Sequence, residues 1–157
     1  MFFLLLLTVI KARWFGFKDC KEDEKRLKPT MAEIPLVISK IDTLLPCLEE
    51  MKEVLMEASP GYELLVAARL EDHALLLETF KPALLSMLKL LQVCSGFGEE
   101  RCATLRHCLA RVDGMRMRVE LTGELLCTPF RRCQEADYMG ECLTPIRHTI
   151  YYNHIFQ

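Results

Sequence analysis

The stretch that decides the fold is "VISKIDTLLPCLEEMKEVL", residues 37–55. Large apolar side chains recur in it at alternating steps of four and three residues: Val37, Ile41, Leu44, Leu48, Met51 and Leu55. Because an α-helix completes a turn every 3.6 residues, this spacing places all six on one side of a helix. The stretch therefore predicts a helix whose apolar stripe packs in a core.

Prolines and glycines predict the ends of this first helix. Pro35 fits the first helical turn, where its missing N–H breaks no hydrogen bond. Pro46 lies inside the pattern and is expected to kink the helix or to split it after Leu45. The sequence Ser59-Pro60-Gly61 is expected to end the element.

Further helices are expected along the rest of the chain. Residues 62–80 are apolar on more than one side, which predicts a helix at the centre of the packing. The pattern resumes over 82–93 and again from about 98 to 127, until Thr128-Pro129. The apolar face of this last helix is expected to comprise Cys102, Leu105, Leu109, Val112, Val119 and Leu126.

The sequence as a whole predicts an all-α protein, an antiparallel bundle of four to five helices with a short irregular C-terminal tail. Its 157 residues, 51% of them hydrophobic, suffice for a substantial core. The expected organisation is a leader outside the core (1–30), a helical bundle domain (31–128), and a short helix followed by an irregular, β-prone aromatic tail (129–157).

The opening residues "MFFLLLLTVIKARWFGFKDC" allow three interpretations. We favour an appended leader ahead of a domain that begins near Met31. The second interpretation is an export signal, although no Lys or Arg precedes the apolar run and no small-residue cleavage site follows it. The third is a segment lying on a membrane surface, for which the candidate membrane-contact residues are Phe2, Phe3, Leu4, Trp14, Phe15 and Phe17.

Eight cysteines stand at positions 20, 47, 94, 102, 108, 127, 133 and 142. Several occupy positions where the helical pattern requires an apolar side chain, and a free cysteine behaves as a small buried hydrophobe. We therefore expect reduced thiols in a cytoplasmic protein. The alternative is a secreted protein in which the cysteines form disulfides.

The residue patterns of enzymes and metal sites are weak or missing. No phosphate-binding loop, nucleophile elbow or zinc-protease motif occurs, and the cysteine and histidine spacings do not match a structural zinc site. We expect no catalytic residues, no cofactor and no metal. A net charge of -2 and the absence of stacking aromatics between the basic residues argue against a nucleic-acid partner.

Arginines are concentrated in the last third of the chain. The candidate patch for an acidic partner comprises Arg101, Arg106, Arg111, Arg116 and Arg118. Steps of five residues turn through about 140° on a helix, so the first four arginines spiral around it. A solvated, ion-paired surface is the competing interpretation.

These observations predict a non-catalytic intracellular adaptor or scaffold that binds a protein partner, for instance a helix, through an apolar groove or stripe. Two alternatives remain open. One is a secreted four-helix, cytokine-like ligand with a signal peptide at 1–20 and disulfides. The other is a peripheral membrane protein that docks through residues 1–18.

Overall fold

The structure, a computed structural model, describes the backbone of residues 2–58, 63–94 and 99–152 and the side chains of 20–57, 64–94 and 101–152. Within these ranges the chain is helical apart from short turns, and no residue belongs to a strand. The all-α prediction is confirmed for this part of the chain.

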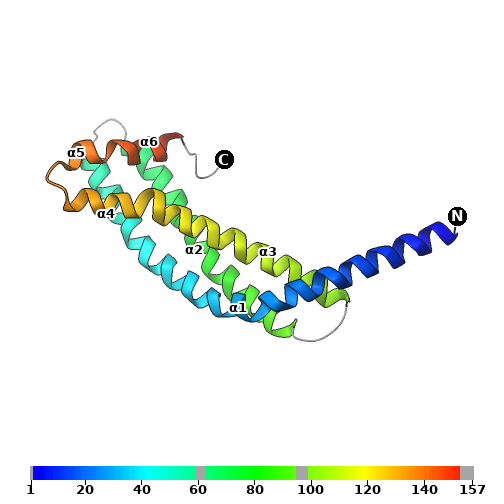
Figure 1. Cartoon of the computed structure of the whole chain (residues 1–157). Coiled ribbons are helices and arrows are strands. Elements are labelled where there is room, and N and C mark those ends of the chain that lie inside the picture. Colours follow the sequence, from blue (N-terminus) through cyan, green and yellow to red (C-terminus); the bar gives the residue numbers. More distant parts are fainter. Residues whose placement is uncertain (1, 59–62, 95–98, 153–157) are drawn as a thin grey trace. The chain divides into compact units, whose positions relative to one another are not determined.

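Three long helices come first: α1 (Phe2–Ala58), α2 (Glu63–Val93) and α3 (Glu99–Thr122). A π-helical turn, η1 (Gly123–Cys127), follows α3 without a break, and α4 (Thr128–Glu135) continues from it. The short helices α5 (Met139–Cys142) and α6 (Thr144–Tyr152) complete the described chain (Figure 1).

The chain divides into two compact units, and each long helix contributes to both. Unit 1 comprises Met1–Leu36 and Ala83–Gly114. Unit 2 comprises Val37–Pro82 and Met115–Gln157.

The core of unit 2 contains the stripe predicted from residues 37–55. All six of its members are buried, so this part of the sequence prediction is confirmed. From α2, the side chains of Val66, Leu70, His73 and Leu77 are buried at the same alternating steps of four and three residues. Such spacing is typical of helices that pack side by side at small crossing angles.

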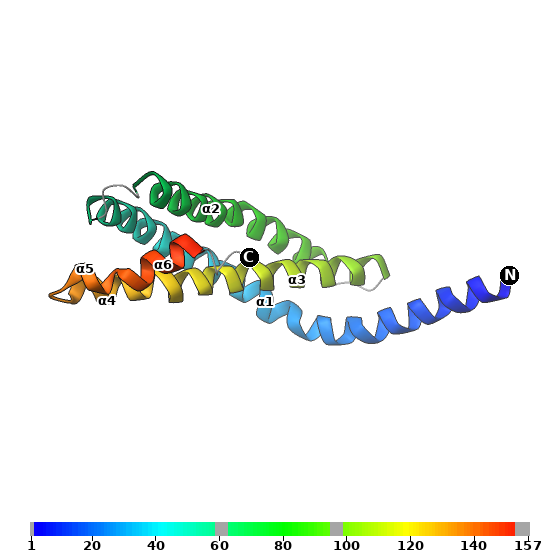
Figure 2. The ribbon, with the colours of Figure 1, turned by 90° about the horizontal axis from the view of Figure 1, so that it is seen from above.

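Two ion pairs fix the direction of α2 against α1 in unit 2. Lys52 Nζ lies 2.7 Å from Glu71 Oε1, and Lys81 Nζ lies 2.6 Å from Asp42 Oδ1. From the first ion pair to the second, the residue on α1 lies ten positions earlier in the sequence, whereas the residue on α2 lies ten positions later. The two helices therefore run antiparallel here, and Figure 2 shows them side by side in cyan and green. The carboxylate hydrogen bonds raise the pKa of both lysines.

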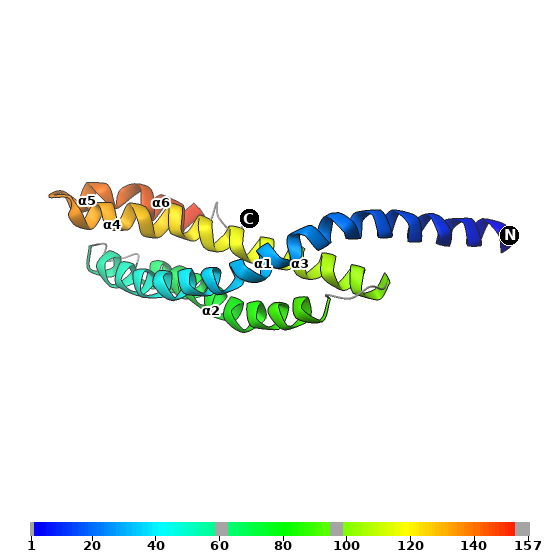
Figure 3. The same ribbon diagram turned by 60° about the horizontal axis from the view of Figure 1, so that its bottom comes forward.

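Gly123 and Cys127, at the two ends of η1, are buried next to α1. A Cβ on Gly123 would lie 3.5 Å from Leu44, and Cys127 Sγ lies 3.9 Å from the Leu44 carbonyl oxygen. Helix α6 packs against the same turn, as Figure 3 shows. Because η1 has neighbours on two sides, Leu126 is buried along with Gly123 and Cys127.

The tail differs from the sequence prediction. The expected stop at Thr128-Pro129 is wrong, because Pro129 lies in the first turn of α4, where a missing N–H is tolerated. The expected irregular, β-prone segment is wrong for residues 144–152, which form α6. Ile146 and Ile150, one turn apart, are both buried, and burial of such a pair outweighs the strand preference of the individual residues.

Unit 1 has a core of its own. Leu27 and Ile34 from α1 are buried, as are Leu84 and Leu91 from α2; the buried apolar residues of α3 in this unit are Leu105, Cys108, Leu109 and Val112. Cys20 and Leu27 lie on the leader side of the predicted boundary at residue 30, yet they are buried, and that boundary falls inside the continuous helix α1. The division into three segments stays a prediction.

Several prolines lie inside the long helices. Pro35, which the sequence predicts to lie in the first turn of a helix, is in the interior of α1, so that prediction is wrong. Helix α1 continues through Pro46 and α2 continues through Pro82, so neither proline splits its helix. An internal proline costs about 3 kcal/mol. Leu44 and Leu48 are buried on either side of Pro46, and burying a leucine stabilises by roughly 1.5–3 kcal/mol. Packing of the flanking residues therefore offsets the lost hydrogen bond.

Candidate functional site

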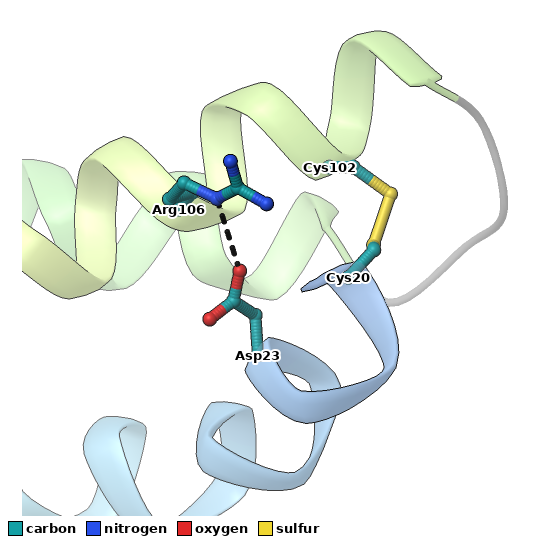
Figure 4. The surroundings of a disulfide bond; sticks show 4 residues. All are labelled: Cys20, Asp23, Cys102 and Arg106. Carbon is teal, nitrogen blue, oxygen red and sulfur yellow. Dashed lines mark hydrogen bonds and ion pairs between the residues drawn. A yellow bond between two sulfur atoms is a disulfide. The ribbon is translucent and has the colours of Figure 1, made fainter. Parts of the chain in front are cut away.

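A disulfide joins α1 to α3 in unit 1. Cys20 and Cys102 are bonded, with their Cα atoms 5.5 Å apart (Figure 4). One turn further along both helices, Arg106 Nε donates to Asp23 Oδ2 over 3.4 Å, and Arg26 pairs with Asp113 beyond it. Residue numbers increase together on the two helices, so α1 and α3 run parallel in this unit.

Two further disulfides lie in unit 2. Cys47 on α1 is bonded to Cys127 on η1, with a Cα–Cα distance of 6.0 Å. Cys133 on α4 is bonded to Cys142 on α5, with a Cα–Cα distance of 5.4 Å across the bend at 136–138. Helices of eight and four residues are marginal on their own, and this bond holds them together.

These bonds correct the prediction of reduced thiols, while the predicted cytoplasmic location stays a prediction. Six of the eight cysteines are paired, and two of the pairs join residues 82 and 80 positions apart in the sequence. Disulfides of this kind persist in oxidising compartments and are reduced in the cytosol. The prediction failed because a helical pattern accepts a buried thiol and a buried disulfide at the same positions.

Cys94 and Cys108, both in unit 1, are the remaining free cysteines, and both are buried. Burial raises the pKa of each thiol, and the nearby Cys94 raises that of Cys108 further. A raised pKa disfavours the thiolate, which is the reactive form. The two thiols therefore have the character of structural core residues.

His73 occupies a core position of α2 in unit 2, between Leu70 and Leu77. Its side chain is 5% exposed, and burial lowers its pKa from 6.5 to about 4. The imidazole is therefore neutral at physiological pH. The neighbouring residues on the buried side of α2, Leu70 and Leu77, are apolar. A positive charge on His73 would therefore be unfavourable at this position.

The five arginines of the candidate acidic-partner patch are distributed over the two units. Arg101, Arg106 and Arg111 are exposed in unit 1. In unit 2, Arg118 is exposed and Arg116 Nη1 pairs with Glu120 Oε1 over 3.2 Å on the same helix. With Arg106 bonded to Asp23 as well, two members of the set are already ion-paired, which agrees with the competing interpretation.

Helix α2 also carries apolar side chains away from its buried side, and these are exposed. The sequence predicted α2 to be central, but Leu64 is 88% exposed and Leu75 63% exposed. Ala68, four residues after Leu64 and on the same side of the helix, is also exposed. Together Leu64, Ala68 and Leu75 form what we call the α2 stripe. Grouped apolar side chains on a protein surface are typical of binding sites.

A second apolar stripe runs along α3 and η1 in unit 2. Met117 is 54%, Leu121 37% and Leu125 39% exposed, at successive steps of four residues. We call these three residues the α3 stripe. The sequence prediction correctly placed Leu105, Leu109, Val112, Val119 and Leu126 in the core. Cys102, the sixth residue of that predicted face, is half-buried. The prediction did not single out the opposite side of the helix. The repeated step of four was the signal that could have found it.

The candidate membrane-contact residues Phe2, Phe3, Leu4, Trp14, Phe15 and Phe17 belong to α1, and their side chains lie outside the described set. None of the helices in the described ranges is long and apolar enough to cross a membrane. Among the described side chains no group of three or more His, Cys, Asp or Glu residues could hold a metal ion.

Comparison with known proteins gives no relative. No protein-family model, no curated protein and no solved structure matches this chain.

Proposed function

We propose that this chain is a secreted, non-catalytic helical ligand that acts by binding a protein partner. The observation that carries the proposal is the set of three disulfides, two of which connect helices distant in sequence. A protein that depends on such bonds is suited to an oxidising environment. The proposed arrangement is an antiparallel bundle of four to five helices, which the ion pairs between α1 and α2 support.

The proposal assigns an export role to the start of the chain. Phe2 to Ile10 supply an apolar run of the length found in signal peptides. Cys20 must remain in the mature protein to bond with Cys102. Cleavage is therefore expected before Cys20.

The α2 stripe is the contact surface in this proposal. Leu64 and Leu75 are the most exposed leucines of unit 2. The exposed acidic residue Asp72 lies between them on the helix, next to Glu71, which already pairs with Lys52. Apolar side chains with an acidic margin suit a partner surface that is apolar at its centre and basic at its edge.

The test begins with the full chain, tagged at its C-terminus and expressed in cells with a secretory pathway. We expect the tag in the medium, a mature N-terminus at or before residue 20, and saturable binding to intact cells that unlabelled protein displaces. Reduction of the disulfides should abolish that binding.

Variants separate the contact surface from the fold. Leu75→Glu should weaken cell binding at least about tenfold, because a buried apolar contact would become an unpaired charge. Leu36→Glu is the matched control, since Leu36 is a 70% exposed leucine in unit 1. Retention of the tagged chain in the cytosol with eight free thiols would contradict the proposal.

A further inference from the structure

Two exposed tyrosines of unit 2 lie in different local structures. Tyr138 is 79% exposed and belongs to the bend between α4 and α5, drawn in orange in Figure 1. Tyr152 is 59% exposed, but it lies on α6 and stacks on His148 with the ring centroids 5.2 Å apart. The described chain therefore offers one accessible phenol in a bend and one on a helix.

The two tyrosines also differ in the charges beside them. Three exposed carboxylates lie one or three positions from Tyr138 in the sequence: Glu135, Asp137 and Glu141. No Lys, Arg or His occurs between positions 133 and 146. Tyr152 has no acidic residue in the ten positions before it or the five after it. An enzyme with a basic active site would therefore be attracted to Tyr138 and not to Tyr152.

The backbone that follows Tyr138 is weakly held. None of the four residues of α5 is buried, and a Cβ on Gly140 would meet no atom within 4 Å. A single helical turn is marginal on its own, so an enzyme could bind residues 139–141 in an extended form at small cost. The bond between Cys133 and Cys142 would still hold both ends of the loop.

We propose that Tyr138 is a site of sulfation, modified by a tyrosine sulfotransferase of the secretory pathway. The inference rests on the proposed secretion of the chain, because this class of enzyme acts in that pathway. In the reaction, the phenolic oxygen Oη of Tyr138 attacks the sulfur of a nucleotide phosphosulfate donor and forms an O–S bond. The bond between the sulfur and the bridging phosphate oxygen breaks, the nucleotide phosphate leaves with the electron pair, and the phenol proton passes to a base of the enzyme.

The acidic loop favours this reaction and is changed by it. The phosphosulfate donor is strongly anionic, so the enzyme that binds it has a basic active site, and carboxylates beside the acceptor are attracted to that site. The product is a sulfate ester, which adds a negative charge next to Asp137 and accepts hydrogen bonds from arginine. Sulfated Tyr138 would therefore strengthen binding to a basic partner surface.

The test uses the purified, disulfide-bonded full chain, a tyrosine sulfotransferase and a phosphosulfate donor that carries radiolabelled sulfate. We expect label on the peptide that contains Tyr138 and none on the peptide that contains Tyr152. Tyr138→Phe removes only the hydroxyl of an exposed side chain, so it should abolish labelling while thermal melting stays unchanged. Chain recovered from the culture medium should carry the sulfate at the same residue.

Variants of the acidic residues test whether charge selects the site. Asp137→Asn should slow labelling about tenfold, because it removes the carboxylate nearest to the phenol in the sequence. Glu53→Gln is the matched control, since it removes an exposed carboxylate from α1, and it should be labelled at the wild-type rate.

Three outcomes would overturn the inference. Purified chain that stays unlabelled, while a tyrosine peptide with acidic neighbours is labelled in the same assay, would exclude Tyr138 as an acceptor. Equal labelling of Tyr152 would show that the acidic neighbours do not select the site. An ester at Tyr138 of the recovered chain that a phosphatase removes would be a phosphate and not a sulfate.

Export and modification are measured separately in the same cells. Exported chain with an unmodified Tyr138 would overturn this inference and leave the proposed function intact. Chain retained in the cytosol would contradict the proposed function and this inference with it.

Discussion

At the scale of single residues, the buried imidazole of His73 makes unit 2 sensitive to acid. The unfolded chain takes up a proton near the ordinary pKa of 6.5, whereas the folded protein resists until about pH 4. Between these values the unfolded state binds more protons. The stability contributed by the neutral imidazole is therefore fully present above about pH 6.5 and is lost as the pH falls towards 4.

We predict that the free energy of unfolding falls by about 2 kcal/mol between pH 7.5 and pH 5 through His73 alone. Urea denaturation at several pH values measures this slope. His73→Leu keeps an apolar side chain at the core position and should flatten the profile over the same interval. An equally steep profile in that variant would assign the acid sensitivity to other groups.

A glycine in α3 offers a gain in stability. Gly114 is exposed in the helix interior, and a Cβ added there would meet no atom within 4 Å. Glycine in a helix costs about 1 kcal/mol relative to alanine, mainly through backbone entropy. Gly114→Ala should therefore raise the free energy of unfolding by about 0.5–1 kcal/mol in chemical denaturation, and a lower midpoint would show that the site tolerates no side chain.

At the scale of the helix, the contrast between the two sides of α1 can be measured directly. Leu48 and Leu55 are buried in unit 2, and removing a buried leucine side chain costs about 2–5 kcal/mol. Leu48→Ala and Leu55→Ala should each lower the denaturant midpoint clearly.

The matched controls lie on the other side of the same helix. Glu49 and Glu53 are exposed, and their replacement by alanine should change the free energy of unfolding by no more than about 0.5 kcal/mol. If the leucine variants were neutral to stability but lost partner binding, the stripe would be a binding surface and its assignment to the core would be wrong.

At the scale of the whole molecule, the disulfides determine how many thiols react. Alkylation under denaturing, non-reducing conditions followed by mass spectrometry should label Cys94 and Cys108 and leave the other six cysteines unmodified. In the native protein both thiols should react slowly, because they are buried and their pKa values are raised. Labelling of all eight would contradict the pairing.

The bond between Cys20 and Cys102 closes a sequence separation of 82 residues. Cross-links of that span stabilise by about 4 kcal/mol when their effect is the restriction of the unfolded chain. Replacing both cysteines by serine should lower the free energy of unfolding by about that amount. The variant Cys94→Ser, which breaks no cross-link, is the comparison, and an equal loss in both would argue against a stabilising bond.

The sequence by itself determined the helical character of residues 37–55 and 105–119 and the side of each that faces the core. Val37 to Leu55 illustrate this, because the positions that recur every three or four residues are set by local helix geometry alone. The same reasoning found Leu105, Val112 and Val119. It failed at Pro46, where burial of the neighbouring leucines offsets the cost of a proline inside a helix. It also failed at Pro129, which lies in the first turn of α4, where a proline is tolerated.

The tertiary structure alone decided which cysteines pair and which apolar stripes stay exposed. Cys47 and Cys127 are 80 residues apart, and nothing in the local pattern distinguishes them from Cys94 or Cys108, which stay reduced. Leu75 and Leu121 likewise look like core leucines in the sequence. Pairing and exposure depend on which helix side meets another helix, and that is a property of the register between distant segments rather than of the residues within one turn.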